Sequence, residues 1–185
     1  MTRERQEWRS KIMTDWNGEL TTHTGFKFRV RTAGPADEAA LHGFFEHVTP
    51  EDLRFRFLTS VKEVGHDRLA QMTDVDHRQA ESFVAFEKDG GPIIATAMLA
   101  CDAGLETGEV AVSISAGYKN RGIGWELLRH VTRYAEAKGV TRLQSLEDRS
   151  NVSAIQLERE MGFTASAYPG DSTLVLLEKT LSAPS

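Results

Sequence analysis

Alternating hydrophobic and polar residues predict several β-strands in this chain. Such alternation places one set of side chains on a buried face and the other on an exposed face. The clearest case is residues 109–115, in which Val110, Val112 and Ile114 alternate with Glu109, Ala111, Ser113 and Ser115. The other strands are expected at residues 28–32, 82–86, 92–100, 142–146 and 173–178.

Apolar residues that recur every three or four positions predict the helices. The first such face is formed by Leu41, Phe44, Phe45 and Val48. A second helix is expected to start at Thr49 and Pro50, because threonine is a common N-cap and proline is favoured at the first helical position. Residues 67–72 are expected to form a short turn of helix.

The longest amphipathic stretch follows Gly122 and predicts a helix that ends at Gly139, the expected left-handed residue. A shorter helix is expected over residues 151–161 and ends before Gly162. The buried face of the longer helix is expected to contain Ile123, Leu127, Leu128, Val131, Tyr134 and Ala135.

The order of these elements predicts the fold class. Strands joined by tight turns are antiparallel, whereas strands joined by a helix are usually parallel. We therefore expect an α/β domain with a central mixed sheet and helices on both faces, rather than a doubly wound fold. This domain is expected at residues 27–180, after an N-terminal extension at 1–26 and before a short tail at 181–185.

Composition narrows the class of protein. The 185 residues include 22 Lys and Arg against 27 Asp and Glu, which gives a formal net charge of −5. Hydrophobic residues make up 40% and charged residues 26%, as in ordinary globular domains. Because nucleic acids and anionic membranes attract basic surfaces, we expect neither as a partner.

Several kinds of site and location are also excluded. No apolar run approaches the roughly 18–20 residues that a spanning helix needs, and the charged N-terminus shows no secretion signal. Cys101 is the only cysteine, so an internal disulfide and a cysteine zinc site are excluded. The six histidines include no His-Glu-x-x-His pattern, and no metal is expected. A cytoplasmic protein is predicted.

Candidate chemistry is concentrated at residues 118–125, between a predicted strand and the long helix. The N-terminus of a helix has unpaired N–H groups and a partial positive charge, so it favours phosphate groups. Gly122 and Gly124 allow a phosphate to approach the backbone, and Lys119 and Arg121 add positive charge. A surface turn with an incidental pair of glycines stays open at this point.

Two common phosphate motifs fail here. A P-loop requires Lys and Ser or Thr after its last glycine, but Ile123 and Gly124 follow Gly122. A Rossmann fingerprint requires a third glycine, but Leu127 occupies that position, and the preceding strand belongs to a hairpin.

The segment instead resembles the acyl-CoA loop of the GNAT acetyltransferases, whose pattern is Gln/Arg-x-x-Gly-x-Gly/Ala. Lys119 stands at the first position, followed by Gly122 and Gly124. Residues 151–163 are similar to a second pattern of that family, Asn-x-x-Ala-x-x-Leu-Tyr-x-x-x-Gly-Phe. The resemblance covers about residues 27–180 and implies the GNAT fold.

Two further segments resemble the catalytic domain of bacterial protein lysine acetyltransferases. These are residues 49–57, with a Pro-Glu-Asp-x-Arg-aromatic stretch, and residues 108–112, with a glutamate before an apolar pair. This resemblance implies that the acceptor is a protein lysine, while a small amine stays open as the alternative.

The family resemblance also implies the site. Acetyl-CoA would be the co-substrate, and Glu109, on the strand before the loop, would be the catalytic base. The frequent family general acid is a tyrosine, but Glu158 stands at that position and leaves the acid unassigned. Contacts to acetyl-CoA are expected from Val112, Ser113, Ile114, Lys119, Asn120, Arg121, Gly122, Ile123, Gly124, Trp125, Asn151 and Ser153.

The sequence therefore predicts an N-acetyltransferase that moves an acetyl group from acetyl-CoA to a primary amine by direct attack in a ternary complex. The missing tyrosine supports a second hypothesis, a catalytically silent acyl-CoA-binding sensor. The oligomeric state is left open by the sequence, a homodimer included.

Overall fold

The computed structural model describes residue 3 and residues 16–182, so the predicted extension at 1–26 and tail at 181–185 lie partly outside the described residues. The strands are β1 Gly18–Thr21, β2 Lys27–Thr32, β3 Ala80–Phe86, β4 Ile93–Cys101, β5 Thr107–Ile114, β6 Arg142–Asp148, β7 Thr164–Ala167 and β8 Leu174–Thr180. The helices are α2 Glu38–Glu46, α3 Pro50–Phe57, α4 His66–Thr73, α5 Ile123–Lys138 and α6 Val152–Glu160, with 3₁₀ turns η1 Pro35–Asp37 and η2 Ala116–Tyr118.

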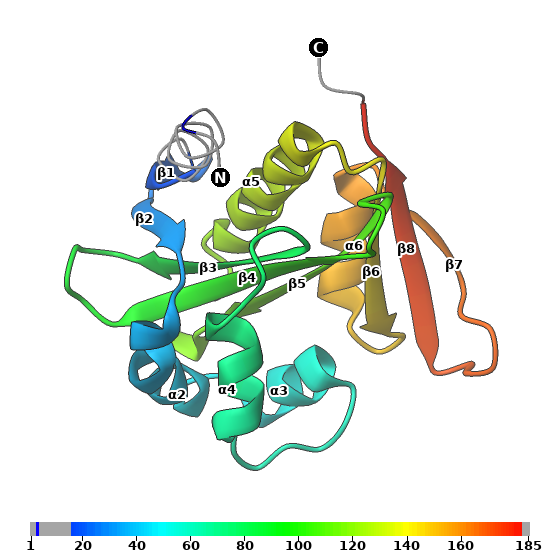
Figure 1. The fold of residues 1–185 in the computed structure, drawn as a ribbon. Helices are drawn as coiled ribbons and strands as arrows, with labels where there is room; N and C mark the ends of the chain where they lie inside the picture. The colour runs from blue at the N-terminus through cyan, green and yellow to red at the C-terminus, as the bar shows by residue number, and fades with distance from the viewer. Residues whose placement is uncertain (1–2, 4–15, 183–185) are drawn as a thin grey trace.

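The strands form one mixed sheet in the order β1-β2-β3-β4-β5-β6-β8-β7. Every neighbouring pair is antiparallel except β5 and β6, which are parallel and joined through α5. Helices α2, α3 and α4 cover one face of the sheet, and α5 and α6 lie on the other (Figure 1). The predicted α/β class, with a mixed sheet and helices on both faces, is confirmed.

Two apolar cores separate the sheet from these helical layers. Leu127 and Val131 of α5 are buried against Phe83 of β3, whereas Val84, the next residue, packs with Leu41 of α2 on the other side. This alternation along β3 is the strand pattern that the sequence predicted. The predicted faces of α2 and α5 are buried, and Gly139 ends α5 at a φ of +86°.

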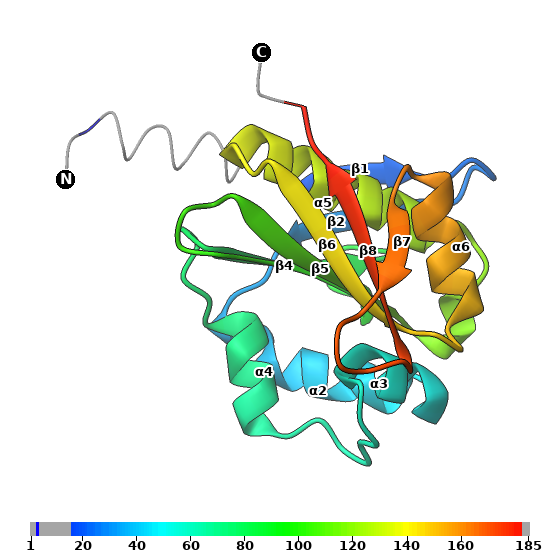
Figure 2. The same cartoon turned by 90° about the vertical axis from the view of Figure 1, so that its right-hand side faces the viewer.

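The sheet opens in its centre. Strands β5 and β6 pair only where residues 107–109 face residues 142–144. Beyond that point β5 stays paired with β4 up to Ile114, and β6 stays paired with β8 up to Asp148. Figure 2 shows β5 and β6 from the side of this opening. The rest of β5 therefore has a strand neighbour on one edge only.

Two strands were not predicted from the sequence. Strand β1 lies within the expected extension at 1–26 and pairs antiparallel with β2. Trp16, just before it, makes edge contacts with the rings of His130 and Tyr134 on α5. Strand β7 is four residues long and contains no apolar residue larger than alanine, so it lacks the hydrophobic pattern of a strand. In residue 3 and residues 16–182, no helix is both long and apolar enough to cross a membrane.

Candidate active site

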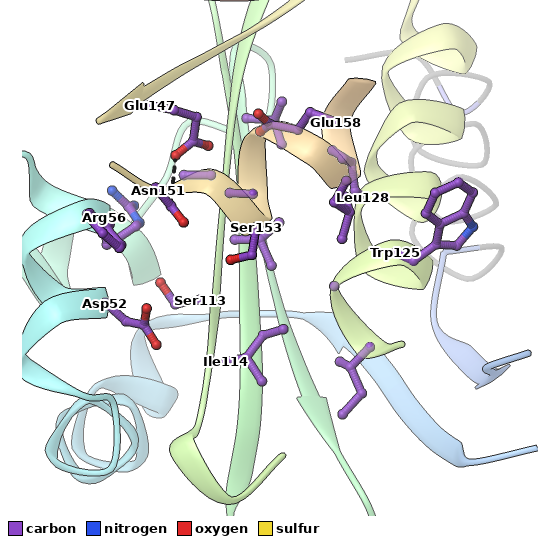
Figure 3. A pocket seen from close by; sticks show the side chains of 18 of the residues that line it. Asp52, Arg56, Ser113, Ile114, Trp125, Leu128, Glu147, Asn151, Ser153 and Glu158 are labelled. Atoms are coloured by element: carbon purple, nitrogen blue, oxygen red, sulfur yellow. Dashed lines mark hydrogen bonds between the residues drawn. The ribbon is translucent and has the colours of Figure 1, made fainter. Parts of the chain in front are cut away.

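A cavity of about 300 Å³ lies at the opening between β5 and β6. Helix α3 forms one wall, and the start of α5 with α6 forms the other (Figure 3). Every residue predicted to bind acetyl-CoA lines this cavity except Arg121, and so does Glu109. The structure thus brings together residues from β5, the loop before α5 and α6 that are far apart in the sequence.

The loop before α5 is shaped by two left-handed residues. Asn120 has a φ of +62° and Gly122 a φ of +84°, a region that favours asparagine and glycine. Gly122 is the N-cap of α5 and no side chain caps the helix there. The first N–H groups of a helix 16 residues long are therefore not satisfied by a capping side chain, which favours an anionic ligand.

Gly124 is required for a different reason, namely close packing. A Cβ atom at this position would lie 3.2 Å from Cδ1 of Ile114 on β5. The glycine therefore lets the first turn of α5 sit directly against the open strand. The two predicted glycines have distinct roles, one in backbone conformation and the other in close approach.

The two basic residues of the loop both interact with other side chains or backbone groups of the protein. Lys119 Nζ lies 2.7 Å from Asp52 Oδ2 on α3, and both side chains line the cavity. The guanidinium of Arg121 lies 4.7 Å from the ring centre of Tyr118, also stacks on Phe26, and donates to the carbonyl oxygen of Gly117. Arg121 is thus directed to an aromatic pair on the surface rather than lining the cavity.

Strand β5 supplies two polar side chains to the cavity. Glu109 is exposed and stands at the last position that pairs with β6, where the opening begins. Ser113 is only 6% exposed, and its Oγ has no hydrogen-bond partner among the described residues. Since buried hydroxyl groups are nearly always hydrogen-bonded, this orphan group indicates a place where a ligand can bond.

Helix α3 brings a positive charge to the opposite wall. Thr49 Oγ1 accepts a hydrogen bond from the backbone N–H of Asp52 at 3.1 Å, so Thr49 is the N-cap that the sequence predicted. One turn on, Arg56 lines the cavity. Desolvation lowers the pKa of Arg56, while the negative charges of Glu109 and Glu147 act in the opposite direction.

A pair of carboxyl groups lies at the back of the cavity. Glu147 on β6 accepts hydrogen bonds from Ser145 Oγ at 2.9 Å and from Asn151 Nδ2 at 3.2 Å. Glu158 on α6 is 6% exposed and lies beside it (Figure 3). Burial, followed by the charge of Glu147 and a hydrogen bond to it, raises the pKa of Glu158 to about 9.

The sequence did not indicate the whole lining. Asp52 and Arg56 lie in a segment singled out only for its resemblance to lysine acetyltransferases, and Glu147 was not singled out. The ring of Trp125 is turned away from the other labelled residues in Figure 3, although Trp125 is part of the lining. Asn151, which was expected at the acyl-CoA arm, bonds the carboxylate of Glu147.

Comparisons with known proteins identify the fold and the family. The model of the Acetyltransferase (GNAT) family matches residues 44–163. The curated acetyltransferase PA5475 of Pseudomonas aeruginosa is 29% identical over 149 residues, which cover 80% of each chain. The GNAT domain of S. lividans PAT superposes with a TM-score of 0.83 at 23% identity, covering 90% of this chain and 98% of that one. The Salmonella typhimurium protein yncA, solved with acetyl-CoA, gives a TM-score of 0.67 at 21% identity, covering 84% and 94%.

The fold and cavity define an α/β domain with a divided sheet, in which an open strand edge lies beside an uncapped helix start. The family model covers more than half of the residues, and the chain belongs to the GNAT family of acetyltransferases. The family and fold predicted from residues 119–124 and 151–163 are confirmed.

Proposed function

We propose that this protein transfers the acetyl group of acetyl-CoA directly to a primary amine, and that the amine is a lysine side chain of a protein. The observation that carries the proposal is the open edge of β5 beside the uncapped N-terminus of α5. One site therefore offers both a strand edge for an extended amide-containing arm and a helix start for a diphosphate.

The residues of the cavity fit acetyl-CoA as a substrate. The backbone of residues 110–114 would pair with the amide groups of the pantetheine arm, and Ser113 Oγ would gain the hydrogen bond that it lacks. The N–H groups at Ile123 and Gly124 would hold the diphosphate. The remaining contacts in the proposal come from Val112, Ile114, Lys119, Asn120, Gly122, Trp125, Asn151 and Ser153.

Glu109 is the proposed base. A lysine-type amine has a reference pKa of about 10.4, so it is mostly protonated at neutral pH and must lose a proton before it attacks. Glu109 stands where β5 and β6 separate, next to solvent and at the edge of the cavity. This position suits proton transfer from the amine through a water molecule.

The charge of the cavity supports a cationic acceptor. Asp52, Glu109 and Glu147 line it together with the basic residues Arg56 and Lys119. The resemblance of residues 49–57 and 108–112 to protein lysine acetyltransferases supports a protein lysine as the acceptor. The likeness in fold to the GNAT domain of S. lividans PAT is consistent with the same class.

The test measures release of the CoA thiol from acetyl-CoA. The acceptors are a lysine-containing peptide, Nα-acetyl-lysine methyl ester, free amino acids and polyamines. We expect the peptide to be acetylated on its lysine, as read by mass spectrometry. If only the free amino acids or the polyamines are acetylated, the acceptor is a small amine and not a protein lysine. Acetyl-CoA binding without thiol release from any acceptor would favour the silent sensor.

A pair of variants tests the base. E109Q should retain acetyl-CoA affinity and lose about 100-fold or more in kcat at neutral pH, as is typical for loss of a general base. The lost activity should partly return at high pH, where solvent deprotonates the amine. The matched control is E106Q, because Glu106 is exposed in the turn before β5 and outside the cavity lining. Equal kcat for E109Q and E106Q would remove Glu109 from the mechanism.

A further inference from the structure

The carboxyl groups of Glu147 and Glu158 meet at the back of the cavity, and the proposed base does not use them. Both residues line the cavity, and they come from neighbouring elements, β6 and α6. In Figure 3 the carboxyl group of Glu158 is directed toward the side chain of Glu147, whose carboxyl group bonds Asn151. Two carboxylates this close repel each other strongly when both are ionised, so such a pair tends to retain a proton.

The hydrogen bonds of the pair decide which residue holds that proton. Glu147 accepts from two donors, Ser145 Oγ and Asn151 Nδ2. The hydroxyl of Ser145 also acts to lower the pKa of Glu158, but burial and the charge of Glu147 outweigh it. Glu158 is 94% buried, and its Oε2 atom has no hydrogen-bond partner among the described residues. A buried and unpartnered carboxyl oxygen favours the neutral acid, because ionisation there would leave a charge without solvation.

The charged groups around the pair do not change this assignment. Glu109 of β5 and Arg56 of α3 face the same cavity, and Arg56 interacts with both Glu109 and Glu147. Lys179 of β8 donates instead to the carbonyl oxygen of Met161, just beyond the end of α6. Strand β7, which also packs on α6, carries no charged residue. Arg56 therefore interacts with Glu109 and Glu147 rather than with Glu158.

We propose that Glu158 is a catalytic residue, the general acid that protonates the sulfur of the departing CoA thiolate. The proposal rests on acetyl transfer from acetyl-CoA, and it assigns the step that the missing tyrosine left without a donor. Its geometric basis is a buried carboxyl group in the cavity wall with one oxygen that bonds no described residue.

Acetyl transfer proceeds in two stages, attack of the amine on the thioester and departure of the CoA thiolate. Glu109 first takes one proton of the ammonium through water and passes it to solvent. The neutral amine nitrogen then forms a bond to the carbonyl carbon of the thioester, and one electron pair of the carbonyl bond moves to oxygen. The extra proton on nitrogen passes through water to Glu109, which returns it to solvent, and the carbonyl bond re-forms. The carbon–sulfur bond then breaks, and its electron pair goes to sulfur. The proton of Glu158 passes to sulfur, so the products are an acetylated amine and a neutral thiol. Glu158 is left ionised beside Glu147, and their repulsion drives its reprotonation from solvent before the next cycle.

The protonation state can be tested without turnover. In protein labelled with ¹³C at the side-chain carboxyl of glutamate, we expect one carboxyl signal that is still in the neutral form at pH 7. This signal should disappear in E158Q and persist in the matched control E160Q, because Glu160 is exposed two residues further on the same helix. A wild-type spectrum with every glutamate ionised at pH 7 would overturn the proposal, whether or not E158Q folds.

The catalytic role is tested by the ratio of wild-type to E158Q kcat across pH, with the acceptor that gives the fastest thiol release. We expect a ratio of about 100 at neutral pH, at the low end for general acid catalysis, and a fall of the ratio at alkaline pH. Wild type and E158Q share the same amine and the same Glu109, so the pH dependence that these groups cause cancels in the ratio of the two kcat values. When both proteins also carry E147Q, the ratio should begin to fall at lower pH. The substitution removes the negative charge that raises the pKa of Glu158.

The outcomes separate this proposal from the function on which it rests. If wild-type protein releases thiol and E158Q matches it, Glu158 is only structural and the proposal is wrong. A lower kcat with a ratio that does not change with pH would also contradict proton donation. If wild-type protein binds acetyl-CoA but releases no thiol with any acceptor, the proposed function fails, and the general acid fails with it.

Discussion

The ammonium of Lys119 is held 2.7 Å from the carboxylate of Asp52, so the loop before α5 is tied to α3 across 67 residues of sequence. The side chains are 42% and 25% exposed. A pair this exposed contributes little to stability, about 0–1 kcal/mol. If the diphosphate of acetyl-CoA binds at this loop as proposed, it would compete with Asp52 for the ammonium of Lys119.

Removing that competitor should strengthen the binding of acetyl-CoA. We expect D52N to lower the Kd measured by calorimetry and K119A to raise it, with little change in Tm for either variant. In the K119A background, D52N should have no further effect on Kd, because the cation is already gone. An equal effect of D52N in both backgrounds would show that Asp52 acts on the ligand directly.

Filling the space at Gly124 should prevent binding of the diphosphate. G124E places a negative side chain at the start of α5, and even G124A brings a Cβ to 3.2 Å from Ile114. We expect G124E to abolish acetyl-CoA binding by calorimetry and G124A to weaken it. The control is G43A in α2, where a Cβ meets no atom within 4 Å and should stabilise the helix by up to about 1 kcal/mol. Wild-type affinity in G124E would contradict the assignment of this loop.

Loss of the N-cap at Thr49 should loosen the wall that carries Asp52 and Arg56. T49A removes the hydrogen bond to the N–H of Asp52, and such losses cost about 0.5–2 kcal/mol. We expect this reduction in the free energy of unfolding in urea, while T49S, which keeps the hydroxyl, should stay close to wild type. A T49A variant as stable as T49S would mean that the cap contributes nothing measurable.

The stability of the protein should depend on pH through Glu158. Burial raises its folded-state pKa from the usual 4.5 to about 9, so the folded state binds a proton that the unfolded state releases. The stabilisation from this proton is complete below pH 4.5 and is lost as pH rises towards 9. Wild type should therefore lose free energy of unfolding relative to E158Q between pH 5 and pH 8. The free energies of unfolding are measured in urea at each pH. If they change with pH in the same way for wild type and E158Q, Glu158 is not a buried neutral acid.

The sequence predicts an element best where the signal for it lies within a short segment. The alternation at residues 109–115 predicted β5, and Gly122 with the apolar pattern after it predicted the start of α5. Each of these signals lies within a few neighbouring residues. The buried faces of α2 and α5 were also predicted correctly, because apolar residues recur in these segments with the period of a helix.

Features that depend on contacts across the fold could not be predicted. Glutamate side chains are mostly exposed in proteins, yet Glu158 is the most buried residue of α6. Its partner Glu147 lies in a strand with weak hydrophobic patterning, and only the folded chain brings the two together. The same holds for Lys119, which the local pattern assigned to phosphate and the structure pairs with Asp52.

The opening between β5 and β6 has a mechanical consequence. Strands β1–β5 and β6–β8 form two half-sheets whose strand pairing across the junction is confined to residues 107–109 and 142–144, with further hydrogen bonds from Thr141 and Arg142 to the carbonyl oxygen of Glu106. Gly108 sits at this junction, and any side chain there would collide with Leu99, since a Cβ would lie 2.7 Å from its Cδ1. An acetyl-CoA molecule bound in the opening as proposed would form hydrogen bonds in place of the missing strand pairing and would join the two half-sheets. Amides of β5 and β6 that exchange hydrogen freely in the unliganded protein should then become protected in concert, so that substrate binding stiffens the entire sheet.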